Sequence, residues 1–151
     1  MVLADRITVL EKGSVVQDGP PAEVALRPRT EYVARLVGLN LYRGRQEGTA
    51  VEVDGGARIE APAPGHGPVF AAFPPRAVAL YPDPPSGTPR NVWPLVVEGV
   101  ERFGDQVRVR LGGPLSLGAD VTPAALAELD LAPGARVWAA VKASEVRCYP
   151  A

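Results

Sequence analysis

The sequence predicts a mainly β protein, and three observations support this fold class. Prolines and glycines number 17 and 16 among 151 residues and are spread along the chain, which is typical of short strands joined by turns. Apolar and polar residues alternate in several stretches, as at Val107, Val109 and Leu111, which is the pattern of a strand with one buried face. Helical patterns are few and short.

The composition indicates a soluble cytoplasmic protein. The formal net charge is −1, so the basic excess expected of a nucleic-acid-binding protein is absent. No apolar run approaches the ~20 residues of a membrane-spanning helix, and the N-terminus lacks the basic and apolar regions of an export signal. Cys148 is the only cysteine and cannot form an internal disulfide, which suits the cytosol.

The first forty residues predict a β-hairpin followed by two short helices. The expected elements are strands at residues 7–10 and 15–17, a turn at 11–14 between them, and a first helix at 22–26. Thr30 can cap the second helix, whose apolar face ends at Val37. Gly38 is the expected end of that helix.

Residues 41–87 predict a middle section of short strands separated by Gly and Pro turns. The candidate strands are residues 41–46, 49–53, 57–60, 69–73 and 77–81. Residues 82–87, with the sequence Pro-Asp-Pro-Pro-Ser-Gly, have the composition of a semi-rigid linker. We therefore expect three parts, which are residues 1–40, 41–87 and 88–151.

The last part of the chain predicts an OB-like barrel. Strands are expected at residues 92–101, 106–111, 115–121, 135–141 and 146–149, and a short helix at 122–129. Thr122 is a suitable N-cap for this helix and Pro123 a suitable first residue. Five strands with one short helix are typical of an OB-like barrel. One such module is expected, not a tandem.

A lysine, a small residue and a hydroxyl group occur together where the last strand pattern is interrupted, at Lys142, Ala143 and Ser144. An ammonium supplies charge, a hydroxyl supplies a directional hydrogen bond, and an interrupted strand frees backbone N–H groups. The combination predicts an anion site. The alternative is that Lys142 is a solvated charge at a strand end, and the spacing alone leaves both interpretations open.

Together with the segment Thr88-Pro89-Arg90-Asn91, this motif resembles the Mop or TOBE domain family of small oxyanion-binding β-barrels. That family opens with a Ser-Ala-Arg-Asn type segment and closes with a Lys-Ala-Ser segment, about where the two motifs lie here. Thr88 keeps the hydroxyl of the usual serine, whereas Pro89 removes one backbone donor. The resemblance implies a homodimer that binds molybdate, tungstate or a similar oxyanion between its barrels through Thr88, Arg90, Asn91, Lys142, Ala143 and Ser144.

The first forty residues resemble the end of an ABC transporter ATPase domain. The segment Leu3-Ala4-Asp5-Arg6-Ile7, the glycine-containing hairpin and the helix start at Asp18-Gly19-Pro20 carry this resemblance. The sequence lacks the G-x-x-x-x-G-K-[ST] phosphate loop, the acidic-ended strand that holds magnesium and the Ser-Gly-Gly signature. Without these motifs the chain has no groups that could position a nucleotide for phosphoryl transfer. We therefore expect no enzymatic activity, no catalytic residue and no ATP site or other cofactor in this chain.

Three other groups of residues could carry a function, and a structural interpretation is preferred for each. His66 has no second histidine or clustered cysteines, so we expect a loop residue and no metal site. A basic and aromatic face could bind single-stranded nucleic acid, but the net charge favours exposed arginines and buried aromatics. Its members are Arg102, Arg108, Arg110, Arg136, Trp93, Phe103 and Trp138. The carboxylates of Asp120, Glu128 and Asp130 show no spacing that pairs them for acid–base chemistry.

The sequence therefore predicts the regulatory, oxyanion-binding C-terminal region of a molybdate-type ABC importer ATPase, located at the inner face of the cell membrane beside its permease. Bound oxyanion would favour one packing of paired barrels and bias how the ATPase halves approach. The alternative is a structural dimerisation domain of a sugar or other importer ATPase, which needs no small ligand. If the chain is a piece of a longer ATPase, its apolar surfaces at residues 3–37 are expected to be exposed.

Overall fold

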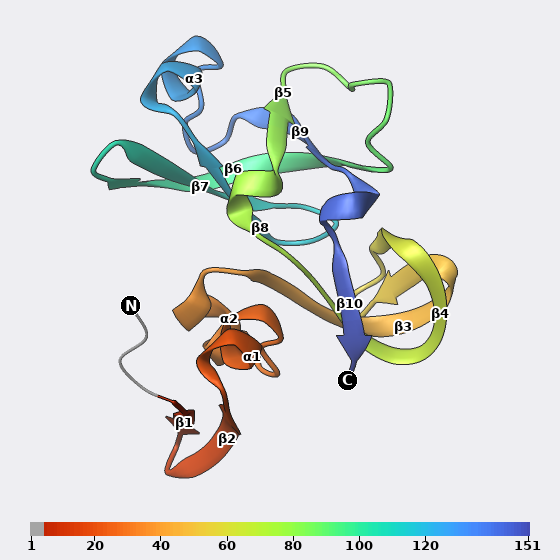
Figure 1. The fold of residues 1–151 in the computed structure, drawn as a ribbon. Coiled ribbons are helices and arrows are strands. Elements are labelled where there is room, and N and C mark those ends of the chain that lie inside the picture. The colour runs from red at the N-terminus through yellow and green to blue at the C-terminus, as the bar shows by residue number, and fades with distance from the viewer. Residues whose placement is uncertain (1–4) are drawn as a thin grey trace.

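The computed structural model describes residues 5–151, and it is mainly β as the sequence predicts (Figure 1). Residues 1–4, which carry part of the resemblance at the N-terminus, lie outside the described residues. The strands are β1 (Ile7–Glu11), β2 (Ser14–Gly19), β3 (Asn40–Val53), β4 (Arg58–Phe73), β5 (Ala79–Tyr81), β6 (Asn91–Phe103), β7 (Gln106–Gly112), β8 (Leu117–Val121), β9 (Arg136–Val141) and β10 (Arg147–Pro150). The helices are α1 (Pro21–Leu26), α2 (Glu31–Val37) and α3 (Pro123–Glu128), with 3₁₀ turns η1 (Pro75–Ala77) and η2 (Ala143–Glu145). None of the described helices is long and apolar enough to cross a membrane.

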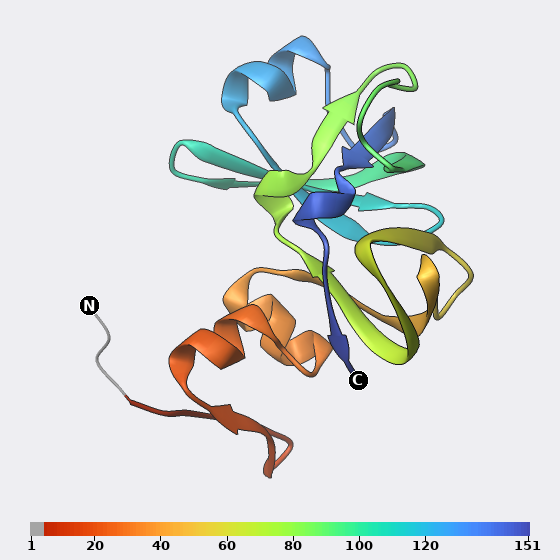
Figure 2. The same cartoon turned by 45° about the vertical axis from the view of Figure 1, so that its right-hand side comes forward.

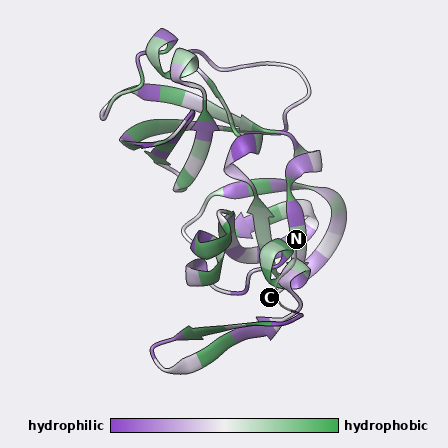
Figure 3. Cartoon of the chain, turned by 60° about the vertical axis from the view of Figure 1, so that its left-hand side comes forward, coloured by the Kyte–Doolittle hydropathy of each residue, from purple (hydrophilic) through white to green (hydrophobic). Residues whose placement is uncertain are grey.

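The hairpin β1–β2 and the helices α1 and α2 form a small unit with its own core. Val9, Val24 and Val33 are buried together in this unit. The Thr30 hydroxyl accepts a hydrogen bond of 3.1 Å from the backbone N–H of Val33, which is the predicted N-cap. Gly38 ends α2 with a φ of 75°, a left-handed conformation that glycine adopts without steric cost. Figure 3 shows that the hairpin lies apart from the two larger sheets.

The same unit presents apolar side chains to solvent. Among the described residues, five of the seven exposed large apolar side chains lie at positions 7–36, and they are Ile7, Leu10, Val15, Leu26 and Leu36. The most exposed of them, Leu36, is 60% exposed. This agrees with the apolar surface that the sequence predicts for this part of the chain.

The remaining strands form two sheets that exchange strands. One sheet has the order β10-β4-β3 and the other the order β5-β9-β6-β7-β8, with antiparallel neighbours throughout. β5 precedes the linker at residues 82–87 but pairs with β9, whereas β10 at the end of the chain returns to pair with β4 (Figures 1 and 2). The pairing therefore crosses the boundary expected between residues 87 and 88, and each sheet contains a strand from the other side of it.

The middle section forms fewer and longer strands than the sequence predicts. β3 and β4 are long curled strands that pair from Asn40–Phe73 to Glu52–Arg58, with a register shift between Gly48 and Ala50. His66, expected in a loop, lies within β4 opposite Glu47. Pro62 and Pro64 are tolerated because residues 61–64 lie at the register shift, where they have no partner in β3, and β10 pairs only with positions 69–72 of β4.

Two asparagines at the starts of β3 and β6 join the sheets in the same way. Asn40 accepts a hydrogen bond from the N–H of Gly118 at 2.8 Å and donates one to its carbonyl at 3.0 Å. Asn91 likewise accepts from the N–H of Glu60 at 2.7 Å and donates to its carbonyl at 3.1 Å. Each asparagine side chain therefore makes the two backbone hydrogen bonds that a neighbouring strand would otherwise make with one residue of the other sheet.

The residues two positions further on repeat this arrangement. The Tyr42 hydroxyl donates to the carbonyl of Ser116, and the Trp93 indole N–H donates to the carbonyl of Arg58 at 3.2 Å. Residues 71–82 and 139–150 also share one plan, which is a strand, a 3₁₀ turn, a second strand and a Tyr-Pro end. The motif pair predicted for an oxyanion site occurs once in the sequence, but the fold that carries it is built twice.

The main core lies between the two halves of the molecule, which are the three-stranded and the five-stranded sheet. Phe73 at the end of β4 is 1% exposed, and its ring centroid lies 5.6 Å from that of Tyr42 and 6.1 Å from that of Trp93. A single buried cluster includes residues of both sheets, such as Ile59 from β4 and Val109 from β7. The two halves therefore share one hydrophobic core.

Candidate functional site

The two predicted motifs meet at one end of the five-stranded sheet. β6 begins at Asn91 and β9 ends at Val141, and these two residues are paired in the antiparallel register. The next positions outward are Arg90 and Lys142, so the two cations lie at adjacent strand ends, and both side chains are exposed. Thr88 is exposed in the segment that leads into β6.

The turn η2 presents the rest of the closing motif. Lys142 precedes the turn in an extended conformation, with a φ of −65° and a ψ of 141°. The turn is closed by hydrogen bonds from Glu145 to the Lys142 carbonyl at 3.0 Å and from Val146 to the Ala143 carbonyl at 3.1 Å. Val146 is buried and fixes the turn on the core, whereas Ser144 is exposed. The lysine and the hydroxyl are thus held on a short rigid segment two residues apart.

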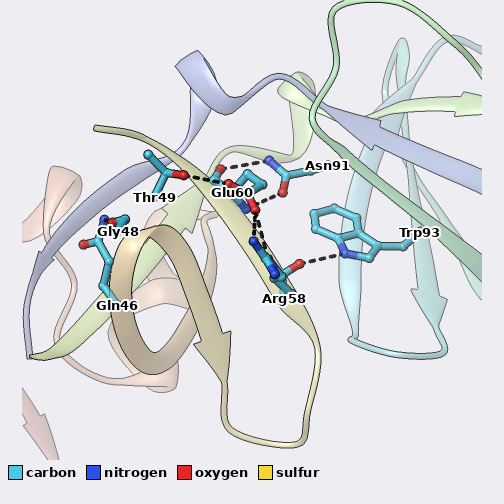
Figure 4. Close-up of polar contacts among 7 residues, drawn as sticks. All are labelled: Gln46, Gly48, Thr49, Arg58, Glu60, Asn91 and Trp93. Carbon is cyan, nitrogen blue, oxygen red and sulfur yellow. Dashed lines mark hydrogen bonds and ion pairs between the residues drawn. The ribbon is translucent and has the colours of Figure 1, made fainter. Parts of the chain in front are cut away.

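Asn91 has a different position from the other candidates. It is 2% exposed, and both polar atoms of its side chain bond the backbone of Glu60 (Figure 4). The amide group is therefore occupied within the protein, and Asn91 fixes the start of β6 beside Arg90. The sequence motif alone does not distinguish this positioning role from ligand contact.

Ser144 also lines a pocket that lies between the two 3₁₀ turns and α1. The pocket has a volume of about 300 Å³, and Arg76 of η1 and Arg147 of β10 line it together with Ser144. Neither arginine belongs to the predicted site. Arg76 could have been found from the sequence, because residues 71–82 are similar to residues 139–150. In that alignment Pro74-Pro75-Arg76 takes the place of Lys142-Ala143-Ser144.

The strand after η2 is tied to the loop between α1 and α2. Tyr149 is 4% exposed and donates a hydrogen bond to the carbonyl of Pro28, and burial raises the pKa of this phenol to about 12. The phenol therefore stays protonated and remains a donor at neutral pH. From the other side, the Gln17 side chain donates to the Arg27 carbonyl and accepts from the Arg29 N–H, both at 2.9 Å. The loop is held from both the hairpin and β10.

Comparison with known proteins places these features in a family. Residues 87–148 match the TOBE domain, and this segment begins just before Thr88 and ends after Ser144. Residues 87–148 belong to the TOBE family. The TOBE segment contains both predicted motifs, while its last strand, β10, pairs with β4 outside the segment.

Two curated relatives are similar to nearly the whole chain. A molybdenum import ATP-binding protein ModC of Mycobacterium tuberculosis is 43% identical over 99% of this chain and 43% of the relative. A molybdate/tungstate import ATP-binding protein WtpC of Pyrococcus horikoshii is 33% identical over 98% of this chain and 43% of the relative. The chain spans less than half the length of these relatives. Because the match includes the first forty residues, the predicted resemblance to the end of an ABC ATPase domain is confirmed together with the TOBE domain.

A solved structure confirms the fold class. The cytoplasmic molybdate-binding protein ModG, crystallised with molybdate bound, superposes with a TM-score of 0.63 over 74% of this chain and 96% of that chain, at 24% identity. This coverage is larger than the TOBE segment alone, so it includes part of the preceding half. The shared fold extends to the middle section that the sequence predicted only as a series of short strands.

The other candidates have structural surroundings. Cys148 is half-buried in β10, and burial raises the pKa of its thiol, which keeps it protonated and weakly nucleophilic. No group of three metal-ligating side chains occurs within residues 5–151, so His66 has no such partners there. Arg108 lies in the TOBE segment but outside its two motifs. Its Nε atom lies 2.8 Å from Oδ1 of Asp120, and this hydrogen bond raises the pKa of the guanidinium. One arginine of the basic and aromatic face that was considered as an alternative is thus paired within the protein.

Proposed function

We propose that this chain is the oxyanion-binding regulatory region of an importer's ATP-binding subunit, and that its ligand is molybdate, tungstate or a similar tetrahedral dianion. The observation that carries the proposal is the pairing of Asn91 with Val141, which sets Arg90 beside Lys142 at one sheet end. The names of the relatives and of the structural neighbour, which concern molybdate and tungstate, support the choice of ligand.

Each of four side chains has a chemical role in this site. The Lys142 ammonium and the Arg90 guanidinium supply positive charge, and charge-assisted hydrogen bonds are the strongest that a protein can offer to a dianion. The hydroxyl groups of Thr88 and Ser144 add directional donors that do not change the net charge. Asn91 holds the backbone of this segment in place by its bonds to Glu60. A homodimer that brings two such sites together would complete the ligand shell.

The regulatory part of the proposal concerns the N-terminal unit. Its exposed apolar side chains, among them Leu26 and Leu36, form a suitable surface for packing on an ATPase domain. Oxyanion binding can bias the ATPase only by favouring one arrangement of this unit over another. ATP hydrolysis and the contact with a membrane permease are assigned to the remaining portion of the subunit, which would hold this region at the inner face of the membrane.

Isothermal titration of the chain with molybdate tests the proposal. The wild type is expected to bind saturably, and the Lys142→Gln variant is expected to bind at least about tenfold more weakly, because a lost charged hydrogen bond costs about 1.5–3 kcal/mol. Lys12→Gln, the same substitution in the turn of the hairpin, is the matched control and should bind like the wild type.

The contradicting outcome is a folded wild-type chain that gives no molybdate binding. This result would favour a structural dimerisation domain without a small ligand. Equal affinity in the Lys142→Gln and Lys12→Gln variants would place the ligand away from Lys142 and would contradict the assignment of the site.

A further inference from the structure

The pocket beside Ser144 joins three parts of the fold that are distant in the sequence. The turns η1 and η2 both lie between the two sheets (Figures 1 and 2), and residues of both turns and of α1 line the same pocket. The residues that matter for its chemistry are Ala25, Leu26, Arg76, Ser144, Glu145 and Arg147. At about 300 Å³, the pocket is at the lower end of the range for small-molecule sites, roughly 300–1,000 Å³.

The charge of this pocket is positive. Its lining includes two guanidinium groups, those of Arg76 and Arg147, and one carboxylate, that of Glu145. Neither arginine forms a salt bridge within 4.0 Å among residues 5–151, where the ion pairs involve other arginines. A guanidinium carries five N–H donors, and Arg147 uses one of them in a long bond of 3.4 Å to the Leu26 carbonyl. Donors of both arginines are therefore available to an anion.

We propose that the oxyanion held at Lys142 and Ser144 sits in this pocket, with Arg76 and Arg147 as two further binding residues. The inference rests on the proposed function and adds a second group of ligand-binding residues, which come from η1 and β10. Ser144 is the one residue of the two TOBE motifs that lines the pocket. Lys142 does not line it and would reach the anion from the rim, two residues before Ser144. Two guanidiniums that chelate tetrahedral oxygens outweigh the repulsion from Glu145.

The position of Arg147 gives this site a direct connection to α1. Arg147 already touches the last residue of α1, Leu26, and Tyr149 two residues later bonds Pro28. An anion bound by Arg147 would lie against Ala25 and Leu26, which line the same pocket. Ligand occupancy would then hold α1 against β10, so the N-terminal unit would respond to the ligand without a long relay.

Arginine substitutions in the pocket test this inference. Titration with molybdate is expected to show a loss of affinity of at least about tenfold for Arg76→Gln and for Arg147→Gln, as for a lost charged hydrogen bond. Arg45→Gln, an exposed arginine of β3 outside the pocket, is the matched control and should bind like the wild type. In the wild type, molybdate should also slow amide hydrogen exchange at residues 25–29. Circular dichroism confirms that each variant is folded.

The outcomes separate this inference from the proposed function. Arg76→Gln is the decisive variant, because within residues 5–151 Arg76, unlike Arg147, makes no hydrogen bond to α1, so the substitution removes charge without removing such a contact. If the wild type binds and Lys142→Gln is impaired, but Arg76→Gln and Arg147→Gln bind like Arg45→Gln, the pocket assignment is overturned and the oxyanion site at Lys142 stands. Binding without slower exchange at residues 25–29 would overturn the contact with α1. A folded wild type without molybdate binding would overturn both proposals.

Discussion

The Phe73→Ala variant is expected to lose about 3–5 kcal/mol of unfolding free energy, the range measured for the truncation of buried aromatic side chains. Phe73 is 1% exposed, and its ring lies between those of Tyr42 at 5.6 Å and Trp93 at 6.1 Å. Its removal leaves a cavity at the meeting point of the two sheets. Urea unfolding followed by circular dichroism and tryptophan fluorescence measures the loss. Phe103→Ala is the control, because Phe103 is 56% exposed and its truncation should cost less than about 1 kcal/mol.

The same experiment tests whether the two halves unfold as one unit. Tryptophan fluorescence reports on Trp93 of β6 and Trp138 of β9, which both belong to the five-stranded sheet. Circular dichroism reports on both sheets, and the exchanged strands β5 and β10 connect them. Both signals should therefore move together in Phe73→Ala. Two separate transitions, with only one of them shifted by the substitution, would contradict the shared core.

The Asn91→Ala variant is expected to lose about 2–4 kcal/mol of unfolding free energy, because it leaves two backbone groups of the half-buried Glu60 without partners and each costs about 1–3 kcal/mol. The bonds that disappear measure 2.7 and 3.1 Å. Chemical denaturation gives this loss. Molybdate affinity of the folded fraction should remain close to that of the wild type, because the Asn91 amide is not available to the ligand.

Asn40→Ala is the matched variant in the other half. Asn40 makes the equivalent pair of bonds to Gly118 but is only half-buried, so the expected loss is smaller, about 1–2 kcal/mol. A strong loss of molybdate affinity in Asn91→Ala, with little loss of stability, would identify Asn91 as a ligand-binding residue and contradict the positioning role.

Local chemistry made much of the fold predictable. The hairpin, the capped helix α2 and the strands of the TOBE segment follow from capping residues, turn residues and alternation that act within a few positions. The exchange of β5 and β10 was not predictable in this way, because strand pairing depends on contacts between positions far apart in the chain. The two ends of β4 were predicted as separate strands, and its middle, residues 61–68, was missed for a related reason. Its prolines interrupt the strand pattern, yet Pro62 and Pro64 are tolerated at the register shift, where residues 61–64 have no partner in β3.

The candidate site likewise contains residues that local motifs predict and residues that only the fold brings together. Lys142, Ser144, Arg90 and Thr88 were found because they belong to two short motifs with a family resemblance. The neighbours Arg76 and Arg147 carry no motif of their own and come to the pocket through the two turns that line it and the return of β10. Asn91 belongs to a motif, but its bonds to Glu60 depend on the packing of one half on the other.

A crystal structure of the chain with tungstate, located by its anomalous scattering, tests the central claim most directly. The proposed site predicts one strong anomalous peak per chain within hydrogen-bonding reach of Lys142 and Ser144, on the side of η2 that faces Arg76 and Arg147. A fully ordered η2 without a peak at saturating tungstate, or a peak only at a distant surface, would contradict oxyanion binding by these residues.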